Sequence, residues 1–155
     1  MKLGYVPVDR EKEAASKTLE YAYDDWTIAR MAAALGRTDD QKAFEKRAAS
    51  FRAVFDEKSG FMRARKSDGA FREPFDPLYA QYGSDYTEGN AWQYSWLVPQ
   101  DPRGLFDRMG QDLAVQRLDH LFAAPAEVQN RAQLFGIYYI VDQWAPGNEH
   151  DLGAP

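Results

Sequence analysis

Two segments of helical periodicity meet at Gly36-Arg37-Thr38-Asp39-Asp40-Gln41, and this junction determines the predicted fold class. Gly36 suits the C′ position that ends a helix, where the backbone is often left-handed. Thr38 and Gln41 fit a capping box, with Thr38 as the N-cap and Gln41 reaching back from position N3. Two helices joined by about four residues lie antiparallel. The junction therefore predicts a helical hairpin.

Apolar residues recur at helical spacing on both sides of this junction. The first helix is predicted to begin near Ser16. Its apolar face consists of Leu19, Ala22, Tyr23, Trp26, Ala29 and Ala33. The second helix has Phe44, Ala48, Phe51 and Phe55 on one face. The adjacent acids Asp24 and Asp25 point about 100° apart on a helix. We interpret them as one solvated acid and one acid paired with a base such as Arg30.

Residues 56–90 form a long connection without helical periodicity, rich in glycine, proline, aspartate and aromatic residues. A connection of this length inside a domain is uncommon unless it is functional. Its aromatic content argues against a disordered tether. We predict an ordered loop folded over one end of a helical scaffold, with a short strand pair around Phe61–Arg65 and Ala70–Phe71.

Further helices are predicted after this loop from capping residues and apolar spacing. They span Asn90–Leu97, Pro102–Met109, Gln111–Phe122, and a segment that begins at Ala124 and runs through Val141. No strand alternation is strong enough to build a sheet. The sequence therefore predicts an all-α fold of helical hairpins with long ordered loops between them.

The composition is that of a soluble globular domain and excludes several classes of protein. The net charge of −5 and the lack of a basic patch argue against a nucleic-acid partner. Cysteine is absent, which excludes disulfides and thiolate metal sites. No apolar run approaches the length of a membrane span, about 18 residues. The first residues contain no apolar h-region, so we expect no signal peptide on this chain.

The best candidate for chemistry lies at Asp85–Trp96, where Glu88 stands beside Gly89 and ahead of three large aromatic side chains. Asn90 is a good N-cap for a short helix, on which Trp92 and Trp96 would share one face. A carboxylate with aromatic surface around it can hold a sugar ring and protonate a leaving oxygen. The same pattern also fits a favourable charge at a helix start above core tryptophans.

A second polar cluster, Asn148-Glu149-His150-Asp151, follows near the end of the sequence. Its oxygen atoms suit a hard cation or hydrogen bonds to a sugar, whereas two histidines are too few for zinc. Glycoside hydrolysis requires two carboxylates. Glu149 and Asp151 are the internal candidates for a partner of Glu88, and nothing in the sequence fixes their distance from it.

Several segments, taken together and in this order, resemble glycoside hydrolase family 92. This family consists of calcium-dependent exo-α-mannosidases, many of them specific for the α-1,2-linked mannose of N-glycans. The segments that carry the resemblance are Ser16–Trp26, Gly60–Arg65, Tyr86–Tyr94 and Gly147–Glu149.

The resemblance implies an (α/α)6 toroid that follows an N-terminal β-sandwich. Residues 1–155 would then be a central fragment of the toroid, without the β-sandwich and without the C-terminal part of the ring. Twelve helices of about 11–12 residues with short loops need roughly 200 residues or more, so this chain can form at most about half of the ring. An incomplete ring would expose apolar helix faces and favour self-association.

The resemblance also implies roles for individual residues. Glu88 would be the general acid of an inverting reaction, and Trp92, Gln93, Asn148 and Glu149 would contact the substrate. Ca²⁺ would grip the mannose hydroxyls, through ligands that the sequence does not identify. The general base is expected beyond Pro155, so we expect the isolated chain to be inactive. The substrate would be a mannose-terminated glycan, met in the periplasm or outside the cell.

Two non-catalytic interpretations compete with this one. A helical repeat scaffold that binds peptides would show helix pairs at one fixed period, and the long aromatic loop counts against it. A carbohydrate-binding module that kept its aromatic platform but lost its base would bind mannose without hydrolysing it.

Overall fold

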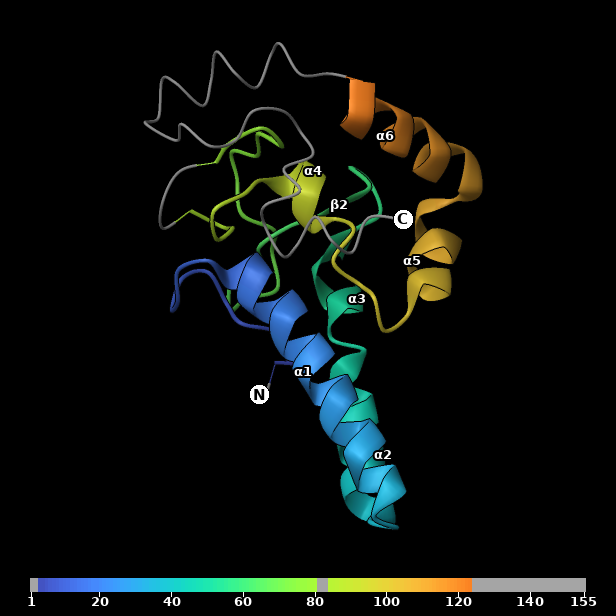
Figure 1. The fold of residues 1–155 in the computed structure, drawn as a ribbon. Helices are drawn as coiled ribbons and strands as arrows, with labels where there is room; N and C mark the ends of the chain where they lie inside the picture. The colour runs from blue at the N-terminus through green and yellow to red at the C-terminus, as the bar shows by residue number, and fades with distance from the viewer. Residues whose placement is uncertain (1–2, 81–83, 124–155) are drawn as a thin grey trace.

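The computed structural model describes residues 3–80 and 84–123 and is mostly helical (Figure 1). Its elements, in chain order, are α1 (Ala14–Ala34), α2 (Thr38–Ala48), α3 (Phe51–Val54), β1 (Phe55–Asp56), β2 (Phe61–Met62), α4 (Ala91–Tyr94), α5 (Pro102–Met109) and α6 (Gln111–Ala123). The prediction of a helical fold is confirmed, with one small sheet that it did not include. The helix predicted from Ala124 lies outside the described residues. Within them, no helix is both long enough and apolar enough to cross a membrane.

The predicted hairpin is present: α1 and α2 lie side by side and run in opposite directions (Figure 1). Gly36 has φ 68° and ends α1 as predicted. Its N–H donates to Ala33 O and the N–H of Arg37 donates to Ala32 O, the two bonds of a Schellman motif. The predicted capping box at Thr38 is wrong. After the Schellman turn Arg37 is already the N-cap, and Gln41 Nε2 donates instead to Glu45 Oε1 at 2.8 Å.

An ion pair ties the two helices of the hairpin together. Asp25 is buried and accepts from Arg47 of α2, through Nη2 at 2.8 Å and Nε at 2.9 Å. The predicted partner Arg30 bonds Glu45 instead, at 2.9 Å, so that expectation is wrong. Asp24 is exposed, as expected for the solvated acid of the pair. The base that pairs with Asp25 therefore comes from the facing helix α2 rather than from α1.

The second half of the predicted long helix takes a different form. The helix ends at Ala48, a single turn follows as α3, and Phe55 enters β1, which pairs antiparallel with β2. Gly60 makes the turn between these strands possible, because it has φ 69° and a side chain there would meet Leu113 Cδ2 at 3.0 Å. The predicted pairing near Phe61–Arg65 exists as a bridge between Arg65 and Phe71.

The hydrophobic core lies where the first half of α1, the small sheet and α4 to α6 converge. Its largest fully buried apolar side chains are Leu19, Phe51, Val54, Met62, Tyr94, Val98 and Leu121. Burial of each such side chain contributes roughly 1.5–3 kcal/mol. The core therefore fixes α4, and the loop that leads into it, against the start of α1.

The outer face of α1 carries an apolar stripe that the described residues leave exposed. Tyr21, Ile28, Met31 and Leu35 are 44%, 42%, 62% and 65% exposed, and their spacing places them on one side of the helix. We expect the purified chain to self-associate through this stripe, with the sedimentation coefficient rising with concentration.

The replacement of Met31 and Leu35 by lysine should return the chain to a concentration-independent monomer in sedimentation velocity. Thr27→Lys combined with Ala34→Lys is the matched control, since it adds the same two charges at exposed positions of α1 beside the stripe. Equal behaviour of the two variants would mean that the stripe does not drive association.

Candidate functional site

The loop that carries Glu88, residues 84–90, is attached to the first turn of α1. The N–H of Glu13 donates to Ser84 O at 2.8 Å, and the N–H of Ala15 donates to Asp85 O at 3.1 Å. The first N–H groups of a helix have no partner inside it, and Glu13 at the N-cap offers no side-chain cap. The carbonyls of the loop fill this role, so the Glu88 loop and the start of α1 are one unit.

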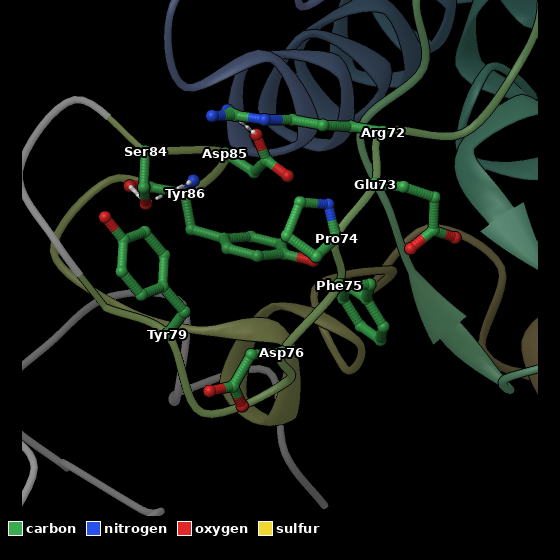
Figure 2. A pocket seen from close by; sticks show the side chains of 9 residues that line it. All are labelled: Arg72, Glu73, Pro74, Phe75, Asp76, Tyr79, Ser84, Asp85 and Tyr86. Atoms are coloured by element: carbon green, nitrogen blue, oxygen red, sulfur yellow. Dashed lines mark hydrogen bonds and ion pairs between the residues drawn. The ribbon is translucent and has the colours of Figure 1, made fainter.

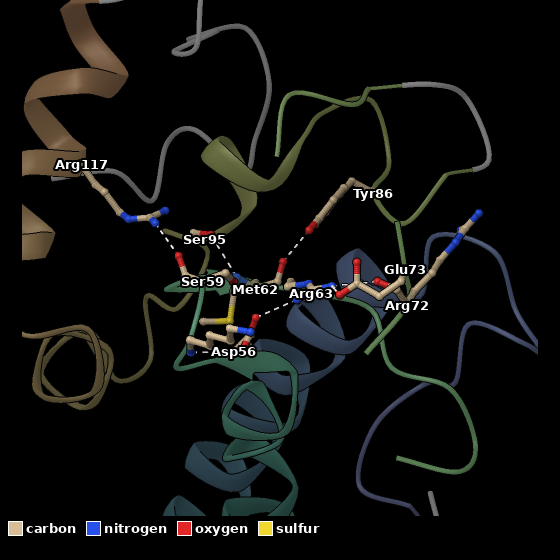
Figure 3. Close-up of polar contacts among 10 residues, drawn as sticks. Asp56, Ser59, Met62, Arg63, Arg72, Glu73, Tyr86, Ser95 and Arg117 are labelled. Atoms are coloured by element: carbon tan, nitrogen blue, oxygen red, sulfur yellow. Dashed lines mark hydrogen bonds and ion pairs between the residues drawn. The ribbon is translucent and has the colours of Figure 1, made fainter. Parts of the chain in front are cut away.

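Two buried hydroxyl groups hold the residue before Glu88. The Thr87 N–H donates to Ser16 Oγ at 2.7 Å, and Tyr94 Oη donates to Thr87 O at 2.8 Å. The Tyr94 ring stacks on Tyr86, with the ring centroids 5.6 Å apart. The Tyr86 hydroxyl donates in turn to Met62 O (Figure 3). Burial raises the pKa of Tyr86 well above its usual value, so this donor stays protonated.

The residues after Glu88 are fixed by the start of α4. Asn90 Oδ1 accepts from the N–H of Trp92 at 2.9 Å and from that of Gln93 at 3.3 Å, and the Asn90 N–H donates to Gln93 Oε1 at 3.0 Å. This capping box confirms the predicted helix start at Asn90. Gln93 is fully buried within it. Contact between Gln93 and a substrate stays a prediction.

Glu88 itself combines an exposed side chain with a constrained backbone. Its φ is 49°, and among the described residues only Glu13 shares a positive φ without being glycine. A left-handed backbone costs a side-chain-bearing residue about 1–2 kcal/mol. Such conformations persist where the surroundings enforce them, and they cluster at functional sites. Glu88 thus presents its side chain at the surface from a backbone of fixed conformation.

The strain at Glu88 leads to a stability prediction. Glu88→Gly and Glu88→Ala both remove the carboxylate, but only glycine relieves the left-handed backbone. We expect the glycine variant to be the more stable of the two by about 1 kcal/mol, measured as the free energy of unfolding in urea. At Lys42, an exposed position inside α2, the order should reverse, with alanine favoured by about 1 kcal/mol. The same order at both positions would argue against strain at Glu88.

Trp92 is part of α4 and packs against α6. It is half-buried, its ring stacks on His120 with centroids 4.5 Å apart, and it meets Phe61 edge to face at 5.1 Å. The guanidinium of Arg117 is 5.3 Å from the ring centroid. Since α4 ends at Tyr94, the predicted helix face shared with Trp96 does not form. Trp96 is instead buried against Phe106.

A pocket of about 380 Å³ opens beside the Glu88 loop (Figure 2). Its lining residues are Arg72, Glu73, Pro74, Phe75, Asp76, Tyr79, Ser84, Asp85 and Tyr86. Its two walls are joined by the ion pair of Arg72 Nη1 with Asp85 Oδ1 at 2.6 Å. On the other side of the loop, the Ala91 N–H donates to Pro77 O at 3.2 Å. The pocket therefore adjoins the Glu88 loop through Ser84, Asp85 and Tyr86, and Glu88 itself is not among its lining residues.

Sequence reasoning placed residues 72–79 in an ordered aromatic loop but named none of them as a site candidate. Their signal is the close mixture of charged and aromatic residues in Arg72-Glu73-Pro74-Phe75-Asp76. Glu20 was also missed. Its Oε1 lies 3.5 Å from Tyr94 Oη, so a carboxylate of α1 lies close to the Glu88 loop in addition to the carboxylate of Glu88 itself. Asn148 and Glu149 lie outside the described residues.

The described residues do not form a calcium site on their own. Calcium takes six to eight oxygen ligands, usually with several carboxylates among them. No group of three or more histidine, aspartate or glutamate side chains that could hold a metal occurs within residues 3–80 and 84–123. We therefore derive no catalytic step through calcium from this part of the chain.

Three of the segments that suggested a family meet at this site. Ser16 of the first segment accepts from Thr87 of the third, and Met62 of the second accepts from Tyr86 of the third. The sequence model of the glycosyl hydrolase family 92 catalytic domain matches residues 1–155. The chain belongs to glycoside hydrolase family 92. This confirms the resemblance that the sequence motifs suggested.

Solved structures of family 92 enzymes from Bacteroides thetaiotaomicron are similar to this chain. The α-mannosidase BT3965 in complex with mannoimidazole is 45% identical over 79% of this chain and 17% of its own, with a TM-score of 0.77. A further structure of BT3965 is 41% identical over 96% of this chain and 18% of its own, with a TM-score of 0.83. The inverting mannosidase BT2199 is 38% identical over 96% of this chain and 21% of its own, with a TM-score of 0.78.

The chain thus spans about a fifth of the length of these family 92 structures, with shares of 17–21%. A comparison with curated proteins finds no match. Membership of family 92 supports a glycosidase of the mannosidase type for the protein to which this segment belongs.

Proposed function

We propose that this chain supplies the general acid of an inverting exo-α-mannosidase that removes terminal α-linked mannose, α-1,2-linked in particular, from N-glycans and other mannosides. The observation that carries the proposal is the Glu88 loop, where an exposed carboxylate stands on a backbone held from both sides. Its support is the similarity to α-mannosidases at 38–45% identity, one of which is an inverting enzyme.

In this proposal Glu88 donates its proton to the glycosidic oxygen as the bond to mannose breaks. Proton transfer needs a heavy-atom distance of about 2.6–3.2 Å, so the position of the Glu88 side chain determines the rate. An inverting enzyme also needs a general base about 6.5–9.5 Å from the acid, with a water molecule between base and sugar. We assign this base to no described residue and expect it elsewhere in the catalytic domain.

The remaining site residues have supporting roles in the proposal. Trp92, Asn148 and Glu149 contact the substrate. Gln93 is buried, so it acts near the sugar by holding the start of α4 through Asn90. Calcium binding is part of the proposal, with ligands that lie outside the described residues.

We further propose that this segment forms up to half of an (α/α)6 toroid, which other parts of the same enzyme complete together with an N-terminal β-sandwich. The share of 17–21% that it covers in the solved family structures supports this arrangement. The isolated chain is then inactive. The enzyme meets its glycan substrate in the periplasm or outside the cell.

The experiment that tests the function is hydrolysis of α-1,2-mannobiose by the full-length protein, followed by proton NMR. Inversion predicts that the mannose released first is the β anomer, before mutarotation mixes the two forms. Release of the α anomer first would refute inversion. Binding of mannobiose without any hydrolysis would indicate a carbohydrate-binding protein rather than an enzyme. Dialysis against a calcium chelator, with restoration by calcium alone, tests the metal separately.

A further inference from the structure

We infer that Ser16 and Tyr94 are positioning residues for Glu88: their hydroxyl groups hold Thr87 and thereby fix the direction in which the Glu88 carboxylate points. The inference rests on the proposed role of Glu88 as the general acid. It adds two residues from elements that flank the loop, the first turn of α1 and the last residue of α4.

The hydrogen-bond geometry fixes both polar groups of the Thr87 backbone. Its N–H donates to Ser16 Oγ at 2.7 Å, and its carbonyl oxygen accepts from Tyr94 Oη at 2.8 Å. A peptide unit is planar, so the hold on Thr87 O also sets the orientation of the Glu88 N–H. The Tyr94 hydroxyl therefore controls the torsion φ at Glu88 through its bond to the carbonyl of Thr87, the residue before Glu88.

Both hydroxyl groups are themselves firmly placed. Ser16 is fully buried and Tyr94 is 2% exposed. Tyr94 Oη has a second neighbour in Glu20 Oε1, but at 3.5 Å that contact is much longer than the 2.8 Å bond to Thr87 O. A hydroxyl has one proton to donate, and the shorter bond receives it. Alanine would also fit in the first turn of a helix at position 16, so the hydroxyl there is explained by its bond to Thr87.

The left-handed backbone of Glu88 makes this hold necessary. With φ at 49°, Glu88 occupies a conformation that a free loop would leave for the lower-energy region of negative φ. Such a change rotates the side chain away from its present direction. A displacement of about 1 Å in a catalytic group can lower the rate by roughly 100-fold. Loss of either hydroxyl should thus weaken proton donation without any change in the carboxylate itself.

Two substrates separate proton donation from the other functions of the site. The leaving group of α-1,2-mannobiose is a sugar alkoxide that requires protonation. The leaving group of 2,4-dinitrophenyl α-mannoside is a stable phenolate that does not. In the full-length protein we expect Tyr94→Phe and Ser16→Ala each to lower kcat/KM for mannobiose by about 10- to 100-fold. For the dinitrophenyl substrate kcat/KM should change less than about threefold, because only a misplaced acid discriminates between the two leaving groups.

Tyr5→Phe is the matched control. The Tyr5 hydroxyl is also on a buried ring and also donates to a backbone carbonyl at 2.8 Å, that of Lys66, which is not part of the Glu88 loop. This variant loses the same type of bond and should leave the ratio of kcat/KM for the two substrates unchanged. Equal losses on both substrates for Tyr94→Phe and Ser16→Ala would overturn the inference, since they would indicate a merely structural role.

A second readout does not depend on turnover. Amide hydrogen exchange at Thr87 in the full-length protein should accelerate about tenfold in Ser16→Ala, which corresponds to a lost bond of about 1.4 kcal/mol, and should not change in Tyr5→Phe. Glu88→Gln distinguishes the two levels of the proposal. If it causes the selective loss on mannobiose but the two hydroxyl variants do not, the positioning role fails and the general acid stands. If Glu88→Gln causes no selective loss, the proposed function fails as well.

Discussion

We expect Glu88→Gln in the full-length protein to lower kcat/KM for α-1,2-mannobiose by about 10²- to 10⁴-fold, the range in which a general acid contributes. Glutamine keeps the shape of the side chain and its exposed position, but its amide has no acidic proton to transfer to the leaving oxygen. The leaving sugar oxygen must then depart as an alkoxide. With 2,4-dinitrophenyl α-mannoside the loss should be at most about tenfold. The measurement is the ratio of kcat/KM for the two substrates in the variant and in the parent.

Glu57→Gln is the control for this experiment, because it makes the same acid-to-amide change at an exposed surface residue that pairs only with Arg108 among the interactions described for it. It should leave both substrates unaffected. A uniform loss on both substrates in Glu88→Gln would assign Glu88 to substrate binding rather than to proton donation. Unchanged turnover of mannobiose would remove Glu88 from the mechanism.

The second large effect is expected on stability, from Arg63→Met. The Arg63 side chain is 8% exposed and bonds Asp56 Oδ2 at 2.8 Å, Glu73 Oε1 at 2.6 Å and Arg72 O at 2.8 Å (Figure 3). Its guanidinium also lies 4.2 Å from the ring centroid of Phe75. Removal of Arg63 leaves the Asp56 carboxylate, itself 9% exposed, buried without its partner. The free energy of unfolding in urea should fall by about 3–5 kcal/mol.

A double variant and a surface variant test this explanation. Arg63→Met combined with Asp56→Asn removes both charges, so it should recover a large part of the lost stability. Arg30→Met breaks the exposed pair with Glu45 and should change the free energy of unfolding by less than about 1 kcal/mol. If the double variant were no more stable than Arg63→Met alone, the lost free energy of unfolding would come from the packing of the Arg63 side chain rather than from the unpaired Asp56 carboxylate.

The same pair determines how stability depends on pH. Burial acts to raise the pKa of Asp56, but the hydrogen bonds that it accepts, including those from Arg63 Nη1 and the Lys58 N–H, hold its pKa below the usual value. A carboxyl whose pKa is lowered in the folded state contributes stability above its unfolded pKa of about 3.9, and this is lost as the pH falls through the lower folded value. The parent should therefore lose stability below about pH 4 more steeply than the double variant.

Local signals in the sequence predicted the ends of elements well. Gly36 as the C′ residue, Asn90 as an N-cap and Pro102 at a helix start are confirmed, since capping depends on a few neighbouring residues. The capping box at Thr38 was wrong because the same six residues also had to complete the turn after α1. Two signals competed there, and the Schellman bonds of Gly36 and Arg37 set the helix start.

The features that sequence reasoning missed all depend on contacts between distant segments. Ser16 and Thr87 are 71 positions apart, and nothing local distinguishes Ser16 from any other serine in a first helical turn. Arg63 appeared only within a motif, because its partners Asp56 and Glu73 meet it through the fold of the loop. Glu88 was predicted as a site residue from its own neighbours in the sequence, and that role stays a prediction. The residues that give it a fixed direction could be identified only from the structure.

The capping of α1 by the Glu88 loop has a consequence for protein engineering. Helix ends without a side-chain cap are routine targets in thermostabilisation, and Glu13, whose side chain makes no cap hydrogen bond, is such a target. A conventional aspartate or serine cap at position 13 would accept from the N–H groups of Ala15 and Ser16, which now donate to Asp85 O, and would compete with that carbonyl. The loop would then lose the bonds of Asp85 O to α1, and the gain in heat resistance would come with a displaced Glu88. A stabilisation programme for this chain should leave position 13 unchanged.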